Sequence, residues 1–282
     1  MTPDPRPSLP AARVRRLAPR ISGADRARAA LGFRDGDKGA HSSRTMMLAE
    51  LSTLLAATES TATHHDFRHL VVDENLLGKR TADNRDRSFA FLSQLYGLDP
   101  GIPTFRLLRR FWDADPDARP LLALLSACAR DPLARAAAPG VLAVRQGERV
   151  DPDRVVEILG TAAARFNPNT LSSLSQNLAS TFSQSGHLIG KLNKTRSRPI
   201  ATPTTAAFAA ALGWMEGGRG QFLLSSLWAR LLDRNPSEVL DLLLAADRAG
   251  WLDVRSAGGI VEVRMDRLLT PSELELCDAV QG

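Results

Sequence analysis

The chain has 282 residues, of which 44% are hydrophobic and 24% charged, and its formal net charge is +5. This length suffices for one large domain or two smaller ones. No apolar run approaches the roughly 20 residues of a membrane span, and the arginine-rich N-terminus lacks the apolar core of a secretory signal. We therefore expect a cytoplasmic protein with no membrane partner, whose Cys128 and Cys277 are buried thiols outside any metal or redox spacing.

Positive charge is concentrated in two stretches of the chain. Residues 1–44 hold ten basic and four acidic side chains, and residues 165–234 hold eight basic and two acidic. Residues 235–282 hold four basic and nine acidic side chains, so the C-terminus is acidic. Such segregation favours a polyanionic partner, of which nucleic acid is the commonest in cytoplasm. The alternative is that the basic stretches are merely solvated.

Residues 1–42 are predicted to form a basic, disordered arm, because the first 22 residues combine prolines and arginines without apolar periodicity. Helical spacing then dominates residues 43–198, for which we expect a multi-helical bundle. Polar caps and Asp-Pro or Asn-Pro openings mark the expected helix starts. Helices are predicted from near Ser43, over 65–78, 82–96, 103–112 and 119–129, from Asp151, from Asn167, and over 204–215 and 219–232.

Residues 199–282 are predicted to form a winged-helix-like domain. A capped, proline-led start opens its last long helix, which leads into alternating runs at 251–254 and 260–263 joined by two glycines. Helix, helix and hairpin follow the order of a winged helix. The outer face of the last helix carries Glu238 and Asp241, whose charges oppose entry into a DNA groove. We therefore expect this module to pack internally or to contact protein.

Between Asn167 and Gly190 the chain runs 24 residues without Lys, Arg, Asp or Glu. Short hydroxyl and amide side chains alternate there with leucines at helical spacing, and four cations follow directly. Such side chains can lie close to phosphates or base edges, and the cations would anchor the backbone. Internal packing and a low-charge protein interface are the alternatives. We predict nucleic-acid contacts from this helix, its basic exit and a second basic patch: Ser172, Ser173, Gln176, Asn177, Lys191, Lys194, Arg196, Arg198, Lys79, Arg80 and Arg85.

Catalytic motifs are missing from the sequence. It contains no glycine-rich phosphate loop, no nucleophile elbow and no paired-cysteine zinc spacing. His65 and His69 are four residues apart, as two metal-binding imidazoles on one helix face would be, but no third ligand is evident. The alternative is that these histidines decorate a helix end. We predict no catalytic residue, no metal and no cofactor.

The stretch Asp73–Thr81 reads DENLLGKRT and precedes an arginine-bearing helix over 82–96, and the charge-free run closes on Ser185–Ile189, SGHLI. These motifs, in this order, resemble the BrxA family of BREX bacteriophage-defence systems over about residues 45–190. The chain departs from that family in its longer basic N-terminus, its appended C-terminal module and the absence of Lys and Arg from its 170–185 helix. The resemblance implies an all-helical, non-enzymatic, DNA-binding accessory protein.

We therefore predict a mainly α-helical protein that binds double-stranded DNA without catalysis, as an accessory of a BREX-like anti-phage defence system. Its acidic C-terminal module would contact other proteins of the defence complex. Two alternatives stay open. One is a protein-interaction adaptor that docks partners on the low-charge helix and the acidic C-terminus. The other is a winged-helix transcriptional regulator that depends on Arg248 and Arg255.

Overall fold

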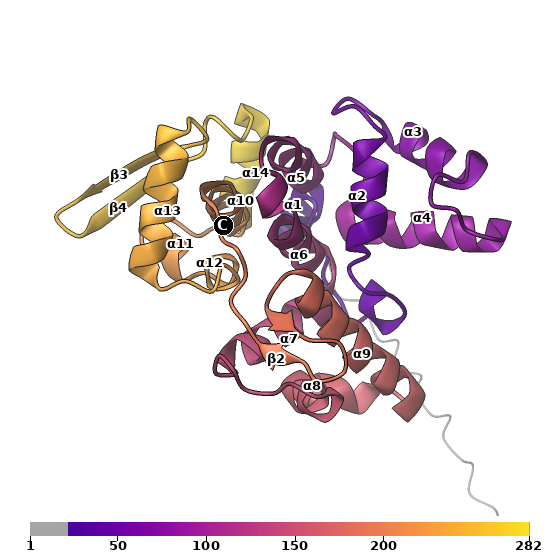
Figure 1. The fold of residues 1–282 in the computed structure, drawn as a ribbon. Helices are drawn as coiled ribbons and strands as arrows, with labels where there is room; N and C mark the ends of the chain where they lie inside the picture. The colour runs from indigo at the N-terminus through magenta and orange to yellow at the C-terminus, as the bar shows by residue number, and fades with distance from the viewer. Residues whose placement is uncertain (1–21, 282) are drawn as a thin grey trace, which may run out of the picture.

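The computed structural model describes residues 22–281 and is mainly helical within that range (Figure 1). Two small antiparallel sheets accompany the helices: β1 (Leu188–Ile189) with β2 (Thr195–Arg196), and β3 (Asp253–Ala257) with β4 (Ile260–Arg264). The expected mainly α fold with a C-terminal β-hairpin is confirmed. The helices in chain order are α1 (Gly23–Leu31), α2 (Leu48–Ala56), α3 (His64–Arg68), α4 (Ala82–Tyr96), α5 (Pro103–Ala114), α6 (Arg119–Arg130), α7 (Pro132–Ala143), α8 (Pro152–Leu159), α9 (Pro168–Gln184), α10 (Pro203–Met215), α11 (Phe222–Ser225), α12 (Leu227–Arg230), α13 (Pro236–Arg248) and α14 (Pro271–Gln281).

Short polar side chains and prolines begin several helices where the sequence predicts them. The Asn167 side chain accepts a hydrogen bond from the backbone N–H of Thr170 at 2.8 Å and so caps α9, and Asp151 caps α8 in the same way. Proline stands in the first turn of both helices, where its missing N–H costs no intrahelical hydrogen bond. These two predicted starts are confirmed.

Two predicted helix boundaries are wrong. The first helix of the bundle begins at Leu48 and not near Ser43, because the chain first makes a short 3-10 turn over Ala40–Ser42. The helix predicted over 65–78 is α-helical only through α3, continues as a wider π turn over His69–Asp73, and then ends. Local spacing of apolar residues did not distinguish these tighter and wider turns from an α-helix.

Residues 22–42 are folded, which corrects the prediction of a disordered arm for that part of the chain. The Ser22 side chain and Asp25 form a capping box that opens α1, and α1 buries Ala27 and Leu31. The Phe33 ring lies 5.9 Å from the ring of Trp228. The rest of the predicted arm, residues 1–21, lies outside the described residues.

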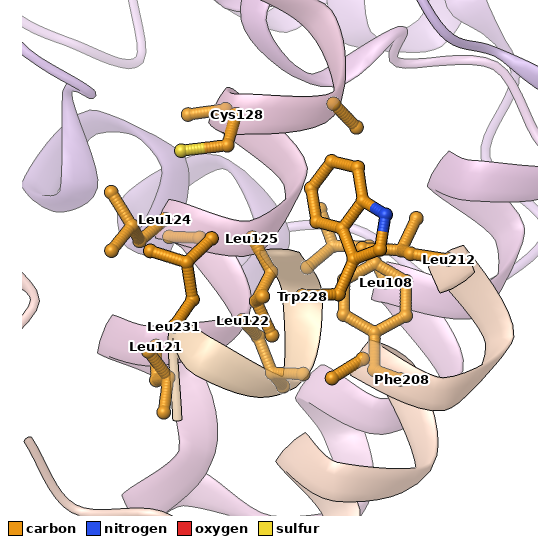
Figure 2. Packing of buried hydrophobic residues seen from close by; sticks show 14 of the residues in the cluster. Leu108, Leu121, Leu122, Leu124, Leu125, Cys128, Phe208, Leu212, Trp228 and Leu231 are labelled. Carbon is orange, nitrogen blue, oxygen red and sulfur yellow. The ribbon is translucent and has the colours of Figure 1, made fainter. Parts of the chain in front are cut away.

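The largest side chains of the core join the middle of the chain to its C-terminal part. Figure 2 shows leucines of α5 and α6 in contact with Phe208 and Leu212 of α10 and with Trp228 of α12. All these side chains are buried, and they belong to one continuous hydrophobic cluster. The boundary predicted between residues 198 and 199 therefore runs through a shared core.

The C-terminal part has the element order expected of a winged helix. The helices α10 to α13 are followed by the β3–β4 hairpin, which projects away from the helices (Figure 1). Val254 pairs with Val263, and both side chains are buried against the module. A two-residue turn of Gly258 and Gly259, both at positive φ, joins the strands. The last helix, α14, returns to pack along α1.

Two further sequence expectations can be compared with the structure. Cys128 and Cys277 are free and buried, as predicted, and burial raises the pKa of the Cys128 thiol to about 12 and that of Cys277 to about 11. Both thiols are therefore protonated and unreactive at neutral pH. Across residues 22–281, every helix is too short or too polar to cross a lipid bilayer.

Candidate nucleic-acid interface

The cations that follow the charge-free run belong to a small β structure that was not predicted from the sequence. Strands β1 and β2 pair with each other, and residues 147–150 lie beside β2, where Arg149 forms an isolated antiparallel bridge with Thr195. The backbone N–H of Val150 donates to the Lys194 carbonyl at 2.8 Å, and that of Arg196 donates to the Glu148 carbonyl at 2.8 Å. We call residues 145–150 and 188–196 together the basic ribbon.

The two faces of the basic ribbon differ in exposure because side chains alternate along a strand. Thr195 pairs with Ile189 on one side and with Arg149 on the other, so these three side chains share a face, which is the outer one. Leu188 and Arg196 pair across the opposite face, and both are buried. The alternation therefore decides which cations of this segment can meet a ligand.

The turn between β1 and β2 projects into solvent. Gly190 takes a φ of +101°, and a Cβ at this position would lie 2.2 Å from the Asn193 carbonyl oxygen, so the turn requires glycine. Lys191 is exposed, and the Leu192 side chain is 94% exposed. The ribbon thus ends in a cation beside an uncovered apolar side chain.

The uncharged outer face of α9 extends to the basic ribbon at the C-terminal end of the helix. Its outer residues recur every three or four positions and therefore form one stripe along the helix. At the C-terminal end of the stripe, the Lys194 ammonium donates to the Ser183 hydroxyl at 2.8 Å. This contact joins the stripe to the ribbon. We call the set the polar stripe: Asn169, Ser173, Gln176, Ser180 and Ser183.

Of the four predicted residues on α9, three are exposed and the fourth forms a hydrogen bond within the fold. Ser172, Ser173 and Gln176 face solvent, and the Gln176 amide lies 3.4 Å from the Ser172 hydroxyl. The Asn177 amide instead donates to the His41 carbonyl at 3.0 Å, which holds α9 against the turn before α2. Asn177 is therefore a packing residue in this structure.

Arg196 was predicted to contact phosphate, but the structure gives it an internal role. Its guanidinium is buried, donates to the carbonyls of Val141 and His187 at 3.1 and 3.3 Å, and lies 2.9 Å from the Asp233 carboxylate. Arg198 is half exposed, and its guanidinium forms an ion pair with Glu238 at 2.9 Å. The two arginines therefore join the ribbon to the C-terminal module.

The predicted second patch is not assembled into a continuous cationic surface. The Lys79 ammonium lies 3.1 Å from the Glu50 carboxylate, and the Arg85 guanidinium donates to the Val72 carbonyl at 2.9 Å. Both side chains are partly buried and stabilise the turn between α3 and α4. Arg80 alone among these three cations is exposed, so we leave the patch out of the interface.

Two cations of the interface were missed by the sequence analysis. Arg145 and Arg149 precede Thr195 of β2 by 50 and 46 residues, and backbone pairing such as that of Arg149 with Thr195 brings them there. Their guanidinium groups have no ion pair or hydrogen bond with other described residues. The polar, charge-rich segment 145–150 between two helices was the one available signal.

Neither a protein-family model nor a curated protein matches this chain.

One buried cluster has the connectivity of a hydrolase triad but no access to a substrate. The His41 Nδ1 atom lies 2.9 Å from the Asp131 carboxylate, and its Nε2 atom lies 3.0 Å from the Thr181 hydroxyl. All three side chains are completely buried. The Thr181 hydroxyl also accepts the backbone N–H of Met46 at 2.8 Å. The cluster therefore serves to fasten α9 and α7 to the turn before α2.

The two histidines considered as metal ligands do not converge. His69 lies 3.1 Å from each of the carboxylates of Asp73 and Glu74, and the hydrogen bond to Asp73 contributes most to raising its pKa. The His65 side chain is exposed at the helix start. Within residues 22–281, no group of three or more His, Cys, Asp or Glu side chains is placed to hold a metal ion.

His187 connects the basic ribbon to the C-terminal module and makes the fold sensitive to acid. Its Nε2 atom lies 3.0 Å from the Leu231 carbonyl oxygen, and its Nδ1 atom lies 2.9 Å from the Ser185 hydroxyl. Burial, reinforced by the neighbouring Arg196, lowers the pKa of His187 from 6.5 to about 3. The imidazole is therefore neutral in the folded protein across the physiological range.

We expect His187→Gln to remove part of the acid sensitivity of the fold. Unfolded His187 takes up a proton below about pH 6.5 whereas the folded side chain does not, so its contribution to stability falls as pH decreases. Between about pH 7 and pH 5 this loss amounts to roughly 2 kcal/mol. Urea unfolding at both values should show a smaller pH dependence for the variant, whose amide can still donate to Leu231. An equal pH dependence in both proteins would refute this assignment.

Proposed function

We propose that the protein binds double-stranded DNA through the polar stripe and the basic ribbon, and that it does so without catalysing a reaction. One observation carries the proposal: the uncharged stripe of α9 ends at Lys194, where it meets a ribbon whose outer face and turn bear Arg149 and Lys191. Exposed cations without carboxylate partners supply the phosphate contacts on which most DNA affinity depends.

Each part of this surface would make a different kind of contact. The cations Lys191, Arg145 and Arg149 would neutralise phosphates, which gives affinity without sequence preference. The hydroxyl and amide groups of the polar stripe would hydrogen-bond to phosphate oxygens or base edges and so set the register of the helix on the duplex. Leu192, at the tip of the ribbon, suits apolar contact with sugars or bases in the minor groove.

The biological setting of the proposal comes from the resemblance of residues 45–190 to the BrxA family. It implies an accessory protein of a BREX-like anti-phage defence system that acts in the cytoplasm on DNA. The non-enzymatic role is part of the same proposal. The buried His41 cluster described above supports it, because its side chains are completely buried and hydrogen-bond within the fold.

The test is the salt dependence of duplex binding by the double variant Lys191→Gln with Arg149→Gln. Both side chains are exposed and bond to no other described residue, so the variant should keep its fold. Loss of two phosphate contacts should reduce the slope of log affinity against log salt by about 1.8. Fluorescence anisotropy with a random-sequence duplex at several salt concentrations measures this slope.

Two variants control that experiment. Glu148→Gln removes an exposed carboxylate from the ribbon and should tighten duplex binding, whereas Arg255→Gln, on the distant β3–β4 hairpin, should change neither affinity nor slope. An unchanged salt slope in the double variant, or an equal decrease of the slope in Arg255→Gln, would show that the basic ribbon is not part of the DNA-binding surface.

The second candidate function is a protein-interaction adaptor, and it rests on a groove in the C-terminal module. The groove, about 530 Å³ in volume, lies between α11, the first turn of α13 and the β3–β4 hairpin. It is lined by Leu240 and Val261, and Phe222 and Ile260 beside it are 79% and 74% exposed. Exposed apolar side chains around a groove are typical of protein contacts. Other proteins of the defence complex would occupy it.

A further inference from the structure

A second cleft, whose lining is polar, lies where the basic ribbon meets the C-terminal module. It has a volume of about 340 Å³ and lies between the end of α7 and the segment that links α12 to α13. Its lining combines apolar and amide side chains with three guanidinium groups and one carboxylate. The lining includes Leu142, Gln146, Arg198, Arg230, Asp233 and Arg234. We call it the arginine cleft.

The positive charges in and behind the arginine cleft exceed the negative ones. The Asp233 carboxylate is paired with Arg196, which is buried behind the cleft, and the Glu238 carboxylate is paired with Arg198. The two remaining guanidinium groups, of Arg230 and Arg234, have no carboxylate partner among residues 22–281. Pairing therefore leaves an excess of two positive charges.

The two unpaired arginines differ in how they are held. The Arg234 guanidinium is partly buried and fixed by three backbone carbonyls, including Asp233 at 3.0 Å and Pro199 at 3.2 Å. Burial, and then repulsion from Arg198, lower its pKa. The Arg230 guanidinium is exposed and makes no hydrogen bond to another described side chain. One cation is thus preorganised and the other can turn towards a ligand.

The first turn of α13 borders the arginine cleft. Asn235, the N-cap of α13, lines the cleft, and the Glu238 carboxylate closes the capping box and offsets the positive end of the helix dipole. Carbonyl groups already accept hydrogen bonds from Arg234, and the nearby carboxylates of Asp233 and Glu238, which offset part of its charge, are each paired with another arginine. An anion would relieve the repulsion among the arginines.

We propose that the arginine cleft binds a phosphate group. The fork geometry of arginine matches phosphate oxygens, and the volume suits a phosphorylated ligand of about nucleotide size, with Leu142 and Gln146 beside its non-phosphate part. The phosphate belongs either to a free phosphorylated small molecule or to a nucleic-acid backbone. This proposal does not rest on DNA binding by the basic ribbon, because the cleft and the outer face of the ribbon use different cations.

The experiment measures the stabilisation of the protein by inorganic phosphate against chloride at constant ionic strength. We expect phosphate to raise the melting temperature of the wild-type protein. Arg230→Gln should reduce the apparent phosphate affinity roughly tenfold or more, since it removes a charged hydrogen-bond donor, and Arg230→Glu should abolish the shift. Arg248→Glu, an exposed arginine of α13 outside the cleft, is the matched control and should respond as the wild type does.

A melting temperature that is insensitive to phosphate in the wild type, or a shift that Arg230→Glu leaves intact, would overturn the proposal. Both outcomes are independent of the salt slope of the ribbon variant, so the two proposals fail separately. Adding a duplex oligonucleotide identifies the source of the phosphate. If the duplex competes with inorganic phosphate for the wild-type protein but not for Arg230→Gln, the cleft binds backbone phosphates. If the duplex does not compete, the cleft binds a free phosphorylated ligand.

Discussion

Replacing Arg196 with methionine is expected to destabilise the fold by about 3–5 kcal/mol, the range measured when one partner of a buried ion pair is removed. The Arg196 guanidinium is buried and bonds to the carbonyls of Val141 and His187 as well as to the Asp233 carboxylate. Methionine fills much of the space but donates no hydrogen bond. The variant therefore leaves the Asp233 carboxylate without its cation, while the carbonyls of Val141 and His187 keep only their backbone N–H donors.

Urea unfolding at neutral pH measures this effect, and Arg198→Gln is its control. Arg198 lies two residues away and forms a half-exposed ion pair with Glu238, so its loss should cost no more than about 1 kcal/mol. The folded fraction of Arg196→Met should retain its salt slope on duplex DNA. Wild-type stability combined with weakened DNA binding would show instead that Arg196 contacts phosphate, as the sequence analysis predicted.

Trp228→Ala is expected to destabilise the protein by about 3–5 kcal/mol. The middle and the C-terminal part of the chain should lose this stability together, in one unfolding transition. The indole is buried beside Phe33 and among leucines of α5 and α6 (Figure 2). Its Nε1–H donates to the Glu216 carboxylate at 2.7 Å, and Arg28 donates to the same carboxylate at 2.6 Å. Truncation thus creates a cavity and removes a hydrogen bond that links α12 to α10.

The measurement is urea unfolding followed by circular dichroism and by hydrogen exchange of amides in α6 and α13. Because these helices share one core, circular dichroism and hydrogen exchange in both helices should report a single unfolding transition. The variant should shift that transition to a lower urea concentration for both helices alike. Phe222→Ala, at a side chain that is 79% exposed, should change the stability by less than about 0.5 kcal/mol. Two separate transitions, only one of them shifted, would contradict the shared core.

Local signals in the sequence were sufficient for much of the fold. The Asn167 and Asp151 caps act over three residues, so their effect on α9 and α8 can be derived without tertiary information. The β3–β4 hairpin was predictable for the same reason, since its alternating strands flank a two-residue glycine turn. Burial of the two cysteines followed from their apolar helical surroundings.

The interface required information that local sequence does not contain. Lys191 and Arg196 belong to the same basic segment, yet one lies in the exposed turn and the other on the buried face, because their strand pairs at a particular register. The same pairing places Arg149 beside Thr195. α1 is a comparable case: it buries Ala27 and Leu31, and its main packing partner, α14, comes from the other end of the described chain.

That packing of α1 along α14 has a consequence for biosynthesis. During translation α1 leaves the ribosome long before residues 271–281 exist, so α1 lacks this packing partner until nearly all of the described chain has been made. A chain truncated before α14 would expose an apolar seam beside its own first helix, and such surfaces favour aggregation or capture by chaperones. The pairing of these two helices thereby distinguishes chains that include α14 from chains that end before it.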